Sequence, residues 1–275
     1  MTAAPTAPRQ LKASGQGRPR LRAVAAAASL AVVADRSGLM ITGGFYLMVT
    51  SVLGGLWMVA ADANQGSIVG YTATALIWYI ATSETSITSL PLRLIEGFGN
   101  DLQTGRLETE LLRPTSVLAV RMANEIGAMV PRLVLCGGLG IGFASLVGGR
   151  PPDAGALALA GPALVLAVTI NLVSQHIFAA AAFWLREAKS AWFLYQKLVF
   201  MLGGMLLPLE VLPLWLERVA KWSPFAAMSY VPARLASGHF EPGWIAVQLV
   251  WLGVVSLGAR WVFAVGERRL VRGDL

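Results

Sequence analysis

Residues 155–184 read GALALAGPALVLAVTINLVSQHIFAAAAFW and contain no Asp, Glu, Lys or Arg. About 20 apolar residues are enough to cross a bilayer as a helix, so this stretch predicts a membrane span. The whole chain of 275 residues is 56% hydrophobic and 13% charged, about half the charged share of a soluble domain. One core could not bury so much apolar surface in water, which excludes a soluble enzyme, a disordered chain and a secreted disulfide scaffold. The sequence predicts an all-α polytopic membrane protein.

Apolar segments of this kind predict six transmembrane helices within one domain, residues 22–275. We place the spans at about 39–61, 67–90, 118–148, 155–184, 190–208 and 243–265. Before the domain, residues 1–21 are rich in Ala, Pro and Arg and predict a disordered cytosolic arm. Residues 22–34 are too short to span, so they predict either a cleaved signal segment or a helix that lies in the membrane interface.

The basic residues decide the orientation of the chain. Six spans place both termini on one side, and Lys and Arg are enriched in cytosolic loops. With the termini inside, the outer segments hold few of the 22 Lys and Arg, namely Arg150, Arg218, Lys221 and Arg234. We therefore predict a multi-pass membrane protein with both termini in the cytosol. The net charge of +7 is explained by topology, and no nucleic-acid partner is predicted.

Two connections are too long for simple turns. Residues 91–117, on the cytosolic side, mix leucines with charged residues as a helix surface does, and Gly97, Gly99 and Gly105 are expected to break that helix. Residues 209–241, on the outer side, are amphipathic and punctuated by proline. They predict short helices that dip into the outer leaflet and return, with aromatic side chains at headgroup depth.

Catalytic machinery is not indicated by any motif in the sequence. There is no GxxxxGK[ST] phosphate loop, no HExxH and no paired Cys/His spacing, so neither nucleotide hydrolysis nor a metal site is predicted on this chain. The single cysteine, Cys136, lies in an apolar block, which excludes an intrachain disulfide. His176, in the fourth span, is interpreted as a hydrogen-bonded packing residue in preference to a ligand. We predict a protein that is not an enzyme.

Ionisable residues inside the membrane are costly and therefore informative. Glu84 lies in the second span within a polar run that includes Ser83 and Ser86. Two interpretations stay open. The run either lines a solute pathway, or Glu84 is a buried carboxylate paired with a basic residue of a neighbouring span.

The third span carries three further charges. Arg121 and Glu125 are four residues apart and share a helix face, which favours an ordinary pair at the cytosolic boundary. Arg132 lies deeper and needs a partner, for which Glu84 and Glu125 are the candidates. In the fifth span, aromatic and methionine side chains either line a cavity for a lipophilic solute or form a packed, lipid-facing surface; they are Trp192, Phe193, Tyr195, Phe200, Met201 and Met205.

Two segments resemble a known family. Residues 105–116, GRLETELLRPTS, resemble the G-x-L-x-x-x-L-x-R-P stretch of ABC export permeases of the type-2 fold, and more narrowly the six-span family of viologen-exporter-type permeases. Residues 203–238 are similar to a pattern of the same family that runs from the fifth span into the outer segment. The matching positions are Gly204, Pro208, Leu209, Pro213, Trp215, Leu216, Pro224, Phe225, Tyr230, Pro232 and Gly238.

The resemblance implies roles that composition does not show. The N-terminal helix would be an elbow helix, and 209–241 would form outer re-entrant helices that carry Pro208, Pro213, Trp215, Pro224, Phe225, Tyr230 and Pro232. The 91–117 loop would contain a coupling helix that docks into a separate ATP-binding subunit. Its coupling residues would be Gly105, Arg106, Leu107, Glu108, Leu111, Leu112, Arg113 and Pro114.

The resemblance also implies partners. Two copies of an ATPase subunit would bind ATP and Mg, so that this chain itself carries no cofactor. A second permease, a related chain or else a second copy, would complete the pathway within the lipid. The alternative is a self-contained secondary transporter that uses the intramembrane Glu84 and Arg132 for ion coupling.

Overall fold

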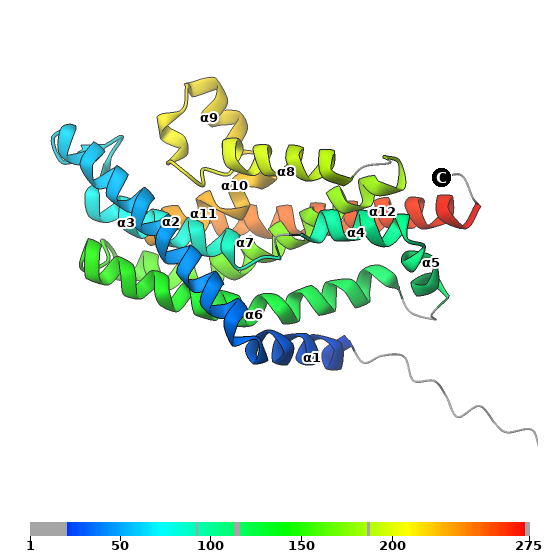
Figure 1. Ribbon diagram of the computed structural model, residues 1–275. Coiled ribbons are helices and arrows are strands. Elements are labelled where there is room, and N and C mark those ends of the chain that lie inside the picture. The colour runs from blue at the N-terminus through cyan, green and yellow to red at the C-terminus, as the bar shows by residue number, and fades with distance from the viewer. Residues whose placement is uncertain (1–20, 92, 113–115, 186–187, 273–275) are drawn as a thin grey trace, which may run out of the picture.

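The computed structural model describes residues 21–91, 93–112, 116–185 and 188–272, and nearly all of them are helical (Figure 1). Within these ranges, four helices are long and apolar enough to cross a membrane. They are α2 (Arg36–Ala63), α6 (Val117–Phe143) with the π-helical turn η1 (Ala144–Gly148), α7 (Ala154–Ala180) with the 3-10 turn η2 (Ala181–Phe183), and α12 (Gly243–Arg272). The chain is an all-α polytopic membrane protein, as its composition predicts.

The two remaining predicted spans are shorter as helices. Helix α3 (Ala73–Thr88) begins later than residue 67, because β1 (Ser67–Ile68) and β2 (Tyr71–Thr72) form a small antiparallel hairpin before it. Helix α8 (Ala188–Leu202) ends before residue 208, because Gly203 and Gly204 follow and Gly204 has φ +63°. At 1.5 Å per residue each helix reaches about 24 Å or less, so it needs neighbouring structure to match a hydrocarbon core of about 30 Å.

The long helices α6, α7 and α12 run roughly along one axis, and α2 crosses them obliquely (Figure 1). One end of the bundle, the terminal end, carries the start of α1 (Leu21–Ala34), the short helix α5 (Arg106–Leu111) and the last turns of α12. The opposite end, the hairpin end, carries β1, β2 and η1. The described chain thus begins and ends on the same side, as an even number of crossings requires.

Small residues allow the helices to approach closely. A Cβ added at Gly140 of α6 would lie 2.4 Å from Tyr46 Oη of α2, and the Tyr46 hydroxyl donates to the Ala81 carbonyl of α3 at 2.8 Å. Helix α1 packs along α6, where a Cβ at Gly127 would lie 2.0 Å from the Ala25 carbonyl oxygen. These contacts agree with the use of glycine for close helix packing in membranes.

The loop at 91–117 folds into two helices. Helix α4 (Leu94–Gln103) runs through Gly97 and Gly99, so these residues do not break it, contrary to the sequence-based expectation. Gly99 instead allows α4 to approach Ala188 of α8, since an added Cβ would lie 2.3 Å from that side chain. The break comes at Gly105, whose φ of +70° separates α4 from α5.

The outer segment folds into short helices, as predicted. They are η3 (Leu209–Val211), α9 (Leu214–Lys221), α10 (Pro224–Met228) and α11 (Tyr230–Ala236). Pro213 directly precedes α9, and Pro224 occupies the first turn of α10, where the missing N–H costs nothing. Helices α10 and α11 pack against α7, and α11 also packs against α3, so this segment folds back onto the bundle.

Candidate functional site

The main feature of the bundle is a cavity of about 850 Å³, here called the central cavity. It lies between α2, α3, α6, α7 and α8, and its walls are predominantly apolar. Ile41 and Phe45 of α2 and Trp192 and Phe200 of α8 line it. Volumes of about 300 to 1,000 Å³ are typical of sites for drug-sized molecules.

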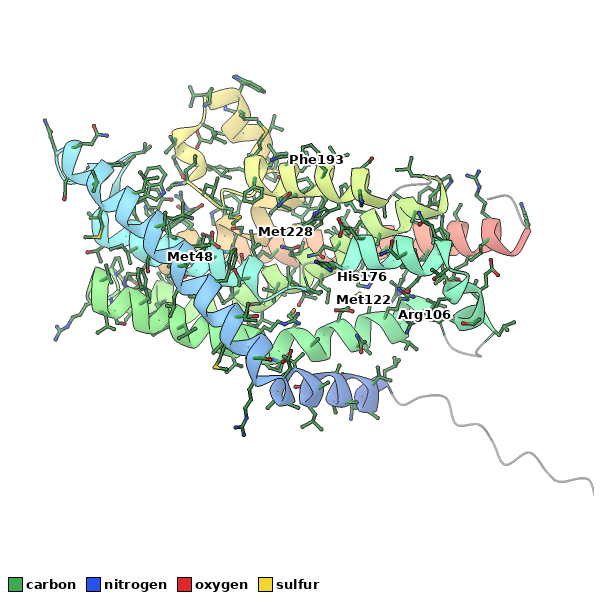
Figure 2. The ribbon with its side chains drawn as sticks, viewed as in Figure 1. Met48, Arg106, Met122, His176, Phe193 and Met228 are labelled. Carbon is green, nitrogen blue, oxygen red and sulfur yellow. The ribbon has the colours of Figure 1, made fainter. Side chains whose placement is uncertain are left out.

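The fifth predicted span contributes to two surfaces at once. Trp192, Tyr195, Phe200 and Met205 line the central cavity, as one of the two open interpretations proposed. Phe193, by contrast, is 60% exposed on the face of α8 that points away from the bundle (Figure 2). In the same view, His176 and Met228 lie buried within the bundle. Met201 is also exposed. The span therefore has a cavity-lining face and a second, outward face.

A few polar side chains are set into the apolar wall of the central cavity. They come from α2, α3, α6, α7, α8 and the turn before α4, and are Thr42, Glu84, Thr88, Arg93, Arg132, Asn171, Gln175, Tyr195 and Gln196. Asn171 Oδ1 accepts hydrogen bonds from the Tyr195 hydroxyl and, at 3.2 Å, from Gln175 Nε2. Glu84 Oε1 and Gln175 Oε1 are buried without a hydrogen-bond partner among the described residues. Two acceptors at this depth are left unpaired.

The polar run in α3 divides between packing and cavity. Glu84 is 1% exposed and lines the central cavity. The Ser83 hydroxyl instead donates to the Met205 carbonyl at 3.0 Å, and the Ser86 hydroxyl to the Ser83 carbonyl at 2.7 Å. Of these three residues, only Glu84 presents a charge to the cavity.

The charges on α6 are placed differently from the sequence-based prediction. Arg121 bonds Asp101 of α4 at 2.7 Å and Glu110 of α5 at 2.9 Å, and it forms no pair with Glu125 among the described residues. Glu125 lines a smaller cavity of about 290 Å³ at the side of α4. Arg132 faces the central cavity, and within the described ranges it forms no ion pair with either predicted partner, Glu84 or Glu125.

His176 has the packing role that the sequence indicated. It is 1% exposed, and its Nδ1 donates to the Leu172 carbonyl at 2.9 Å. Its ring also lines the smaller cavity, together with Asp101, Arg121 and Glu125. Cys136 is buried and unpaired.

The predicted coupling residues divide into buried and exposed ones. Leu107 is 1% exposed in the core of the terminal end, and Leu111 is packed against that core. Arg106, Glu108 and Leu112 are exposed, with Leu112 at 86%. Gly105 supplies the left-handed turn before α5. Arg113 and Pro114 lie outside the described residues.

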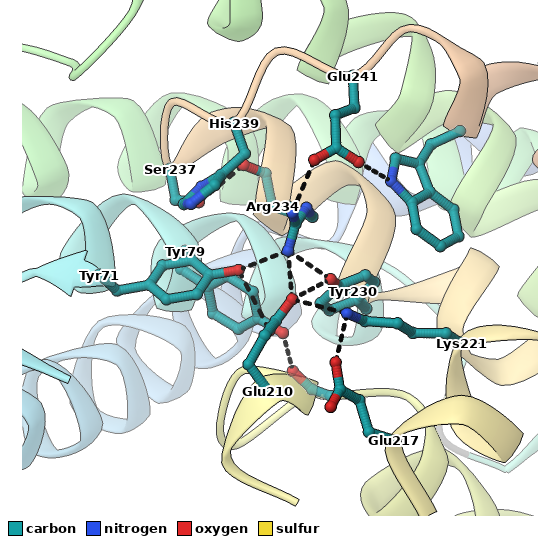
Figure 3. Close-up of polar contacts among 12 residues, drawn as sticks. Tyr71, Tyr79, Glu210, Glu217, Lys221, Tyr230, Arg234, Ser237, His239 and Glu241 are labelled. Atoms are coloured by element: carbon teal, nitrogen blue, oxygen red, sulfur yellow. Dashed lines mark hydrogen bonds and ion pairs between the residues drawn. The ribbon is translucent and has the colours of Figure 1, made fainter. Parts of the chain in front are cut away.

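At the hairpin end, the outer segment carries an ion cluster that sequence reasoning missed (Figure 3). This outer polar cluster consists of Tyr71, Glu210, Lys221, Tyr230, Arg234 and Glu241. The carboxylate of Glu210 accepts from the Tyr230 hydroxyl at 2.5 Å, from Lys221 Nζ at 3.1 Å and from Arg234. Arg234 also bonds Glu241 at 2.7 Å. Only Tyr230 belongs to the predicted site residues, and its i,i+4 spacing from Arg234 is the one local sign of the cluster.

Electrostatics in the outer polar cluster favour the charged state of its carboxylate. Burial alone would raise the pKa of Glu210, but hydrogen bonds from Tyr230 and Lys221 and the charge of Arg234 bring it below its usual value. The cluster joins β2, η3, α9 and α11. It therefore fixes the outer segment as a unit.

The other residues predicted for the re-entrant helices differ in burial. Pro208 and Pro232 are buried, Phe225 is partly buried, and Trp215 is 69% exposed. Between α8 and η3, the backbone at 203–206 is held to the bundle by side chains. Tyr79 Oη donates to the Gly204 carbonyl at 2.5 Å, and Trp57 Nε1 to the Leu206 carbonyl at 2.8 Å. Because Met205 and Leu206 line the central cavity, these bonds hold this part of its wall in place.

The chain is thus a helical bundle with a predominantly apolar cavity between its helices. The family model for ABC-2 family transporter proteins matches residues 45–272. The chain therefore belongs to the ABC-2 transporter family and is a transmembrane permease of ABC transport systems. A comparison with curated proteins gives no match.

Proposed function

We propose that the chain is the membrane subunit of an ATP-binding cassette exporter in the bacterial cytoplasmic membrane. It has six crossings, with α3 and α8 completing the set of four long spans, and an elbow helix, α1. Both termini face the cytosol, so the terminal end of the bundle is the cytosolic end. The observation that carries the proposal is the central cavity in a chain of this family, with α5 at the terminal end of the bundle.

The driving force comes from a partner in this proposal. Two copies of an ATPase subunit bind ATP and Mg, and a second permease, a related chain or another copy, completes the pathway. The exposed residues Arg106, Glu108 and Leu112 of the α5 region form the contact with the ATPase. Alternating access then follows from rigid-body rocking of the two halves.

Arg121 supplies the mechanical link. Its guanidinium holds α4 through Asp101 and α5 through Glu110 while it is anchored on α6. Helix α6 carries Arg132 into the wall of the central cavity. A push on α5 is thus passed through charge-assisted hydrogen bonds to a cavity-forming helix.

The test uses two exposed leucines. Leu112 is 86% exposed beside α5, and Leu146 is 89% exposed at the hairpin end. With the chain co-expressed with its ATPase, we expect Leu112→Asp to reduce the co-purified ATPase about tenfold or more, since a charge is then buried in the contact. Leu146→Asp, the matched control, should leave the yield of the complex unchanged. Equal yields for wild type and Leu112→Asp would reject the docking surface.

The energy source distinguishes the proposed ATP-driven exporter from the alternative, a secondary transporter. Glu84 and Arg132 both line the central cavity, which that alternative also requires. Vesicles that contain only this chain should accumulate no solute against its gradient when an ion gradient is imposed. Uphill transport without ATPase and nucleotide would favour the alternative.

A further inference from the structure

Two hydrogen-bond acceptors in the central cavity have no donor among the described residues, and the kind of ligand that could bind there follows from this. Glu84 is 1% exposed, lines the cavity and forms no hydrogen bond or ion pair among the described residues. Gln175 of α7, which also lines the cavity, is 4% exposed, and its Oε1 is also unpaired among the described residues. A buried carboxylate and a buried amide oxygen are both acceptors, so the cavity lacks donors that would satisfy them.

Two of the donors in the cavity wall are already engaged. The Tyr195 hydroxyl and Gln175 Nε2 both donate to Asn171 Oδ1. Arg93 and Arg132 also line the cavity, but neither forms a hydrogen bond or ion pair with Glu84 among the described residues. The carboxyl group of Glu84 therefore has no hydrogen-bond or ion-pair partner within the described part of the chain.

The remaining wall is suited to the apolar body of a ligand. Phe45, Trp192, Tyr195 and Phe200 bring aromatic rings to the cavity. Aromatic faces attract a nearby cation and pack against apolar groups. A volume of about 850 Å³ is large enough for a drug-sized molecule.

We propose that the central cavity binds amphiphilic primary or secondary amines in their protonated form. The ammonium group donates to Glu84 and to Gln175 Oε1, and the apolar body lies between α2 and α8. The transport of such amines rests on the proposed exporter function, but their binding to the permease is a separate property.

The test compares three fluorescent probes that share one body. Dansylcadaverine carries a primary ammonium group, its N-acetyl derivative is neutral, and its trimethylammonium analogue is charged but has no donor at the head group. Binding is measured by fluorescence anisotropy with the full chain in lipid nanodiscs, without ATPase. We expect the amine to bind about tenfold or more tightly than either analogue, because a charge-assisted hydrogen bond is worth about a factor of ten or more.

Variants assign the effect to the two acceptors. Glu84→Gln should weaken amine binding about tenfold or more and leave the neutral probe unchanged. Gln175→Leu should weaken amine binding by a smaller factor, about threefold. The matched control is Glu241→Gln, which should change the binding of neither probe. Glu241 is a partly exposed carboxylate outside the helices that line the cavity.

Three results would overturn the proposal. Equal binding of the amine and the N-acetyl probe would show that the apolar body alone determines binding and that the ammonium group contributes nothing. Equal binding of the trimethylammonium probe would remove the hydrogen-bonding role, and unchanged amine binding in Glu84→Gln would remove Glu84 itself. If amine binding fails this test but the ATPase still associates, only the ligand class is rejected. If the ATPase does not associate but the amine still binds, only the exporter function is rejected.

Discussion

Two buried carboxylates, Glu210 in the outer polar cluster and Glu84 in the central cavity, have opposite surroundings. The Glu210 side chain is 15% exposed and accepts from Tyr71, Tyr230 and two cations (Figure 3). Glu84 is 1% exposed and accepts from no described residue. The same chemical group is therefore fully partnered at the hairpin end and unpartnered in the cavity.

We interpret Glu210 as a structural residue, whereas Glu84 is the functional residue in the ligand proposal. A buried charge is tolerated when cations and hydrogen-bond donors surround it, and it is costly when they do not. Glu210 joins elements that are distant in sequence, and so it stabilises the outer segment. Glu84 destabilises the chain around it, and residues that break local rules in this way are typical of functional sites.

The largest expected effect is on stability, and it comes from replacing Glu by Gln at position 210 and, separately, at position 84. Glu210→Gln leaves Arg234 and Lys221 without their shared counter-ion, and should destabilise the protein by about 3 kcal/mol. Glu84→Gln removes an unpaired charge, and should leave stability unchanged or raise it by about 1 kcal/mol. The apparent melting temperatures of both variants and wild type in one detergent measure the contrast. Similar losses at the two positions would contradict the distinction.

A second test asks whether the partnered ions at the terminal end act like the outer polar cluster. Arg121 is 19% exposed with two carboxylates within 2.9 Å, whereas Arg106 is 72% exposed and lies 3.8 Å from Asp101. Arg121→Met should cost about 2 kcal/mol and speed hydrogen exchange in α4 and α5, because both helices lose their tie to α6. Arg106→Met should cost less than about 0.5 kcal/mol. Unchanged exchange in Arg121→Met would remove the mechanical link from the proposed function.

The helical membrane fold was predictable because it depends on composition. Long apolar segments dictate spanning helices wherever the backbone must satisfy its own hydrogen bonds. The ends of α3 and α8 were not predictable, since the β1–β2 hairpin and the turn at Gly204 depend on local backbone conformation. The family resemblance was carried by short motifs, and the family match confirms it.

The candidate site was only partly predictable for a different reason. A charge inside an apolar segment identifies Glu84, but helical spacing does not show that Ser83 and Ser86 turn to backbone carbonyls, as serine in a helix often does. The partners of Arg121 lie 11 and 20 residues away across a loop, and Tyr71 lies 163 residues from Arg234. Such pairs are set by tertiary packing, so periodicity within one helix cannot reveal them.

The smallest expected effect tests the exposed edge of the outer polar cluster by pH. Hydrogen bonds from Arg234 and from Trp244 lower the pKa of Glu241 below its ordinary value of 4.5. A carboxylate with a depressed pKa in the folded state contributes stability above its unfolded pKa and loses it as the pH falls through the folded value. Because the Glu241 side chain is 49% exposed, the contribution is about 0.5 kcal/mol.

The measurement is the melting temperature of wild type and Glu241→Gln between pH 6 and pH 3.5. Above pH 5 the wild type should be slightly more stable, and the gap should close as Glu241 is protonated below pH 4.5. The pKa of Glu210 is lowered as well, so both proteins lose stability in acid, but that loss is common to them and cancels in the difference. A gap that persists unchanged at pH 3.5 would mean that Glu241 stabilises by packing and not by charge, and the cluster would then end at Arg234.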